Sequence, residues 1–133
     1  MIDIENALFT EVKKALVGAF PNISVEGVED YVPSSFPFVN FYESDNSTNR
    51  RTIDSSGIEK YARVTYVANV YSAKATGKKE EAKKILGIID EIMTGHGFVR
   101  QSARPVATDD PTLHRRVARY RGNADTNKTI YRG

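Results

Sequence analysis

The sequence predicts an α+β domain in which an antiparallel β-sheet is flanked by two main α-helices and extended by a long β-hairpin arm. Two segments, 4–20 and 76–97, repeat apolar residues at the spacing of an amphipathic helix. Runs of alternating β-branched and aromatic residues lie between these segments and after the second one. The length of 133 residues fits one domain, residues 1–133, with its own core.

The first predicted helix, in the segment 4–20, is indicated by apolar residues three and four positions apart. They are Ile4, Leu8, Val12, Ala15, Leu16, Ala19 and Phe20. Asp3 is a candidate N-cap, and Pro21 is expected to end the helix because it lacks a backbone donor.

Two strands are predicted next. Ile23 and Val25 mark a short one, and Phe38 to Glu43 form a second strand that begins after Pro37. Residues 44–57 are polar and lack a strong period, so we expect a long hairpin arm or a loop there.

Residues 58–73 contain the clearest strand pattern in the chain. One alternating set is apolar and forms the expected core face: Ala62, Val64, Tyr66, Ala68 and Val70. The other set mixes polar and apolar side chains: Tyr61, Arg63, Thr65, Val67, Asn69 and Tyr71. Apolar content on both faces indicates a helix on one side of the sheet and a partner on the other.

The second predicted helix is followed by strands. Its apolar stripe is Ala82, Ile85, Leu86, Ile88, Ile89, Ile92 and Met93. Thr76 is a candidate N-cap, and Gly95 and Gly97 are expected to stop the helix. Residues 98–107 predict a strand broken by Pro105, and residues 123–133 are expected to be a C-terminal tail.

The segment "DDPTLHRRVARYRG", 109–122, is locally ambiguous. As a strand, it alternates Leu113, Arg115, Val117, Arg119 and Arg121 with His114, Arg116, Ala118 and Tyr120. As a helix, it has Asp110 as N-cap and Pro111 in the first turn. In both cases its arginines exceed what one buried face holds, so they must meet water, phosphate or carboxylates.

Charge is unevenly distributed along the chain. Residues 1–30 have six carboxylates and two lysines, whereas residues 99–133 have eight cationic side chains and three aspartates. Such asymmetry is typical of a nucleic-acid tail, of copies that meet acidic face to basic face, or of charges that are simply solvated.

Nothing in the sequence predicts catalysis, a metal site or a cofactor. There is no cysteine, and the nucleotide-binding, zinc-protease and nucleophile-elbow motifs are absent. His114 lies near Asp109 and Asp110, but no nucleophile or third ligand has a defined spacing to them. His96, between two glycines, is expected to cap a helix end. No signal peptide or membrane span is predicted.

The order of elements resembles the tail-terminator, or tail-completion, proteins of long-tailed bacteriophages. The similar features are the strand "FPFVNFY", the long strand "IEKYARVTYVANVYS", the helix "KKEEAKKILGIIDEIM", the segment "GHGFVRQS" and the closing "DDPTLHRRVARYRG". The resemblance implies that residues 113–122 form a strand. It also implies a non-enzymatic structural protein without cofactor or metal, in the virion tail–neck region and, during assembly, in the host cytoplasm.

The resemblance further implies a homo-oligomeric ring, usually a hexamer, that caps the tail tube. Its expected partners are copies of itself, the tail-tube protein and a head-side neck or stopper protein, while genomic DNA passes through the lumen without specific binding and no membrane is involved. The residues expected at subunit or partner interfaces are Arg50, Arg51, Arg115, Arg116, Arg119 and Arg121.

Two other functions remain open on the sequence. One is a head-completion protein, acting as a neck stopper or adaptor. The other is a small nucleic-acid-binding module that uses Arg115 to Arg121, with Tyr120 as a stacking residue.

Overall fold

A computed structural model describes residues 4–27, 36–48, 61–108, 110–125 and 130–132. These residues form one six-stranded sheet and two helices, so the α+β prediction is confirmed. The elements are α1 (Glu5–Ala19), β1 (Ser24–Glu26), β2 (Phe38–Thr48), β3 (Tyr61–Ser72), α2 (Lys78–Gly95), β4 (Val99–Val106), β5 (His114–Asp125) and β6 (Ile130–Arg132). The strand order is β1-β2-β3-β5-β4, and β6 also pairs with β5.

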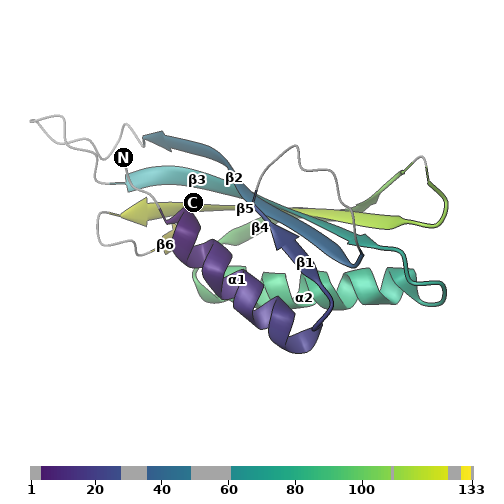
Figure 1. The fold of residues 1–133 in the computed structure, drawn as a ribbon. Helices are drawn as coiled ribbons and strands as arrows, with labels where there is room; N and C mark the ends of the chain where they lie inside the picture. The colour runs from purple at the N-terminus through teal and green to yellow at the C-terminus, as the bar shows by residue number, and fades with distance from the viewer. Residues whose placement is uncertain (1–3, 28–35, 49–60, 109, 126–129, 133) are drawn as a thin grey trace, which may run out of the picture.

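Both helices lie on the same face of the sheet (Figure 1). We expected helices to flank the sheet, and they do so from one side only. The opposite face carries no helix in the described part of the chain. This arrangement gives the sheet a helix-covered face and an open face.

The sheet is mixed, whereas we predicted an antiparallel one. β1 pairs with β2 in parallel, and the other strand pairs are antiparallel as expected. The sequence pattern identifies Val25 and Phe38 as strand residues, but it does not reveal the relative direction of their strands.

The core lies between the helices and the helix-covered face. The predicted core set of β3, from Ala62 to Val70, is completely buried and packs with Leu8, Val12 and Leu16 of α1. From α2, Ala82, Ile85, Leu86, Ile89 and Met93 are buried. Tyr66 stacks on Phe41 and meets Phe98 edge-on, each at 5.5 Å between ring centroids. The two amphipathic stripes and the apolar side of β3 are therefore the reason that the chain folds in this way.

The helix ends differ from expectation in their details. α1 begins after Ile4, which makes no side-chain cap, and Asp3 lies outside the described residues. α2 begins after Gly77, whose φ of 82° is left-handed, rather than at Thr76. At its C-terminus Gly97 has a φ of 101°, and the Phe98 N–H donates to the Met93 carbonyl. The predicted glycine stop is thus confirmed.

The C-terminal third contains more strand than we predicted. β5 runs from His114 to Asp125, so the helical alternative is wrong, and β6 occupies part of the segment expected as a tail. β4 continues through Pro105, because it lies at the edge of the sheet where a missing backbone donor is tolerated. β2 continues beyond Glu43 to Thr48 after a register shift, and the remainder of the predicted arm, 49–57, lies outside the described residues.

Candidate functional site

The arginines of β5 divide between the two faces of the sheet. In the register, Arg115, Arg119 and Arg121 pair with Tyr71, Val67 and Thr65 of β3, which form the mixed set. Arg116 instead pairs with Val70, a fully buried core residue. Because side chains alternate along a strand, the first three point to the open face and Arg116 points toward the helices. The predicted interface residues are thus not one cluster.

Two more arginines join the open face. Arg63 of β3 follows the same alternation, and Arg104 of β4 pairs with Val117 of β5. We call this set the arginine face: Arg63, Arg104, Arg115, Arg119 and Arg121. Sequence reasoning did not select Arg63 or Arg104, although Arg63 belongs to the mixed set that the alternation of β3 predicts.

The arginine face has no described carboxylate partner. None of its members forms an ion pair with a carboxylate in the part of the chain that the structure describes. Asp45 of β2 is on the same face, but Thr65 of β3 separates it from Arg121. Guanidinium groups prefer planar, bidentate acceptors such as carboxylate or phosphate, so this face suits an anionic partner.

One arginine is already held in place. Nε and Nη2 of Arg115 both donate to Oδ1 of the buried Asn69, at 3.2 and 2.7 Å. The guanidinium also lies 5.4 Å from the ring centroid of Tyr71. Tyr71 in turn contacts Phe38 at 5.9 Å between centroids. Arg115 is therefore mainly a structural part of the open face, because hydrogen bonds and a cation–π contact already engage it.

Arg121 and Asn123 leave polar atoms unsatisfied on the open face. Nε of Arg121 and Oδ1 of Asn123 are buried and have no hydrogen-bond partner among the described residues. A buried polar atom without a partner costs about 1–3 kcal/mol. A chain that docks on this face can remove that cost by supplying an acceptor and a donor.

An acidic surface lies on the opposite side of the molecule, in the helix layer. Glu11 of α1 and Glu91 of α2 line a groove of about 470 Å³ together with Ile92, Gly95 and His96. We call it the acidic groove. Nε2 of His96 lies 2.6 Å from Oε1 of Glu11, so this histidine ties α1 to α2 in addition to its position at the helix end. Glu91 is exposed.

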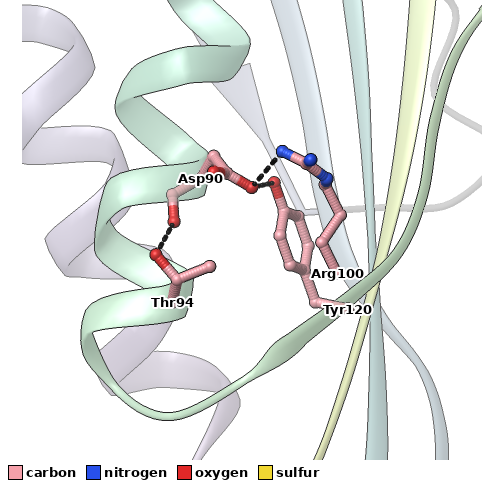
Figure 2. A network of polar contacts seen from close by, with 4 residues as sticks. All are labelled: Asp90, Thr94, Arg100 and Tyr120. Carbon is pink, nitrogen blue, oxygen red and sulfur yellow. Dashed lines mark hydrogen bonds and ion pairs between the residues drawn. The ribbon is translucent and has the colours of Figure 1, made fainter.

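A polar network fastens α2 to the strands beneath it. Figure 2 shows Asp90 of α2 facing the side chains of Tyr120 of β5 and Arg100 of β4. The Tyr120 hydroxyl donates to Oδ1 of Asp90 at 3.0 Å, and Nη1 of Arg100 approaches the same oxygen at 3.1 Å. Burial, together with the hydrogen bond to Asp90, raises the pKa of Tyr120 well above its ordinary value. This tyrosine is thus a buried donor and not the stacking residue of an exposed surface.

In the segment 109–122, His114 and Asp110 form no described hydrogen bond or ion pair with each other. Oδ1 of Asp110 accepts from the backbone N–H of Thr112 at 2.9 Å and from its hydroxyl at 2.7 Å, and these bonds lower the pKa of Asp110. This is the predicted turn. Desolvation lowers the pKa of His114, and the positive charge of Arg116 lowers it further. Asp109 lies outside the described residues.

Arg50 and Arg51 also lie outside the described residues. In the described part, no three His, Asp or Glu side chains are grouped so that they could hold a metal ion. Neither described helix combines the length and the apolar composition that a membrane span requires. Comparison with models of known protein families and with curated proteins finds no match to the chain.

Proposed function

We propose that this protein is a structural subunit of a phage tail, which forms a ring with copies of itself, caps the tail tube and joins the tail to the head-side neck. The observation that carries the proposal is the arginine face, an open face of the sheet whose cations have no described carboxylate partner. The resemblance in the order of elements supplies the biological context.

Two different surfaces of one chain can join copies in a ring. The arginine face and the acidic groove lie on opposite sides of the molecule, the first on the sheet and the second in the helix layer. A contact between two different surfaces is heterologous, and it produces a closed ring when the rotation between copies closes. Opposite charges on the two surfaces favour this pairing over contact between two like surfaces.

In the proposed contact, the exposed Arg104 and Arg119 of one copy approach Glu11 and Glu91 of the next. Arg121 and Asn123 then obtain partners for their unsatisfied atoms. Arginine suits such a contact because its guanidinium is weakly hydrated and binds carboxylates bidentately.

The ring's other partners follow from the same proposal. They are the tail-tube protein on one side and a neck or stopper protein on the other, with DNA passing through the lumen. A head-completion stopper or adaptor is the alternative within the same structural class. Pull-down with the tail-tube and neck proteins encoded by neighbouring genes separates the two roles, because a tail cap binds the tube protein directly.

Sedimentation of the purified chain tests the ring contact. The wild type is expected to form a discrete oligomer of several copies. The variant R104E/R119E is expected to associate roughly tenfold more weakly or worse, because two attractive contacts become repulsive. K74E/K84E is the matched control, since both lysines are exposed and lie outside the two surfaces. A wild type that stays monomeric at every concentration contradicts the proposal.

Nucleic-acid binding is the second candidate, favoured by the arginines of the open face and by the half-buried Tyr71 beside them. Fluorescence anisotropy with labelled duplex and single-stranded DNA at physiological salt separates the candidates. A dissociation constant tighter than about 1 μM for a monomeric chain would favour DNA binding. For the ring protein we expect weaker, salt-sensitive binding.

A further inference from the structure

A second groove lies on the helix-covered side, between α2, β4 and β5. It has a volume of about 340 Å³, and its lining includes Lys83, Leu86, Gly87, Asp90, Arg100 and Arg116. We call it the basic groove. It is separate from the arginine face, because Arg116 points to the opposite side of β5 from Arg119.

The charges in the basic groove are not balanced. Asp90 is its one acidic lining residue among those described, and this carboxylate already accepts from Tyr120 and pairs with Arg100 (Figure 2). Lys83 and Arg116 form no ion pair with a described carboxylate. Two cations of the groove are therefore available to an anion.

Arg116 has an unsatisfied donor. Its Nε is buried and has no acceptor among the described residues. A carboxylate binds a guanidinium most favourably through two parallel N–H···O bonds, which can use Nε and one Nη together. Arg116 lines the groove, so a carboxylate bound there is the kind of acceptor that its donors lack.

Gly87 leaves space in the groove. It lies in the middle of α2, where glycine is unfavourable to the helix, and no left-handed backbone requires it there. A Cβ at this position would meet no atom within 4 Å, so packing inside the chain does not require glycine either. Since Gly87 lines the groove, the absent side chain widens the space that a ligand can enter.

We propose that the basic groove binds a carboxylate on a short apolar stem, held by Arg116 and Lys83, with the stem against Leu86, Gly87 and Ala103. The aliphatic part of the lining suits a stem of a few carbons. The charge of Asp90 disfavours a dianion such as phosphate more than a singly charged carboxylate. The ligand is either a small organic acid or a Glu or Asp side chain of another copy of the chain. The assignment does not depend on the proposed ring.

Titration of the full chain with butyrate, a singly charged carboxylate on a short apolar stem, followed by ¹⁵N amide NMR at constant ionic strength, tests the site. Saturable shifts are expected at Gly87, Ala103 and Arg116. K83Q is expected to weaken binding severalfold, whereas K84Q, at the neighbouring exposed lysine outside the groove lining, leaves it unchanged. Shifts that are absent, or that K83Q and K84Q alter equally, overturn the proposal.

Two further variants separate binding from folding. R116M is expected to lose at least tenfold in butyrate affinity while its thermal midpoint without butyrate stays equal or rises, since a buried unsatisfied donor is removed. G87A is expected to raise the thermal midpoint and still weaken binding, because the new methyl group enters the groove. Full butyrate affinity in R116M, or in G87A, contradicts the assigned site. Tighter binding of inorganic phosphate than of butyrate contradicts the assigned chemistry.

Sedimentation of the wild type in saturating butyrate separates the two possible sources of the carboxylate. Dissociation of the wild-type oligomer supports the site and assigns the natural carboxylate to a side chain of another copy. An unchanged oligomer, with the NMR shifts present, supports the site and assigns it to a small acid.

Discussion

The two faces of the sheet use the same strands for different purposes. On the helix-covered face, side chains such as Val64, Tyr66 and Ile89 are completely buried, and the Tyr120 hydroxyl is tied to Asp90 inside the chain. On the open face, Arg104 and Arg119 are exposed and make no described ion pair. The difference indicates that the first face supplies the stability of the fold, and that the second is available for contacts with other molecules.

The largest effect is expected on the helix-covered face. I89A removes a fully buried side chain between α2 and the sheet, and it should lower the free energy of unfolding by about 2–5 kcal/mol. Urea denaturation measures this change. A loss below about 1 kcal/mol would mean that α2 packs more loosely than its burial indicates.

Reversal of charge on the open face should leave the stability of the fold nearly unchanged and should weaken self-association. R104E/R119E is expected to change the free energy of unfolding by less than about 0.5 kcal/mol, because neither side chain has a described partner to lose. The same variant is expected to weaken self-association. Thermal or urea unfolding of a dilute sample, below the concentration of assembly, checks the first part. A large loss of stability in the dilute variant would show that Arg104 and Arg119 make contacts inside the folded chain.

Removal of one hydroxyl group tests how much the polar network beneath α2 contributes to the stability of the fold. Y120F removes the donor to Asp90 but keeps the ring, so it should cost about 1–2 kcal/mol in unfolding free energy. Self-association is expected to stay as in the wild type. A variant that unfolds like the wild type but fails to assemble would place Tyr120 at the interface instead.

A smaller effect concerns pH. The pKa of His114 is lower in the folded chain than in the unfolded chain, because of its burial and of the cations Arg116, Lys78, Lys79 and Lys83. As the pH falls below about 6.5, the unfolded chain takes up a proton first, so the unfolding free energy decreases. H114Q is expected to flatten this part of the pH profile. A profile that keeps its slope in H114Q assigns the effect to another group.

The smallest effect is expected at the exposed pair in the helix layer. Glu11 and His96 have side chains that are 49% and 42% exposed, so E11Q should cost about 0.2–1 kcal/mol at most. Urea denaturation at low and high salt checks this value. A larger loss that is independent of salt would indicate that the pair positions α1 on α2.

Much of the helix-covered face could be predicted from the sequence. The apolar spacing in α1 and α2 and the alternation in β3 are local patterns, and they predicted most of the buried residues. Of the predicted stripes, Ala19 is exposed and Ile88 and Ile92 are only half-buried. If residues 113–122 form a strand, their alternation also predicts that Arg116 lies on the opposite face of the sheet from Arg115 and Arg119. Local signals did not decide between strand and helix there.

The rest depends on contacts between distant segments. The mixed set of β3, with Val67 and Tyr71, predicted a helix on one face of the sheet and a partner on the other. Both helices pack on one face, and the partner stays a prediction. The basic groove brings Lys83 close to Arg116, and the acidic groove brings Glu11 close to Glu91. The sequence spacing of neither pair predicts that its two residues are close. Lys83 and Arg116 are close because α2 packs on β5, and Glu11 and Glu91 are close because α1 packs on α2.

The central claim is that the arginine face of one copy contacts the acidic groove of the next. Sedimentation of two variants, alone and mixed, tests it most directly. R104E/R119E carries acidic residues on both surfaces, and E91K carries added positive charge in the acidic groove. Each variant alone is expected to stay dissociated where the wild type assembles, and an equimolar mixture is expected to recover oligomers because opposite charges meet again at alternate contacts. A mixture that stays dissociated, or an E91K variant that assembles like the wild type, would contradict the claim.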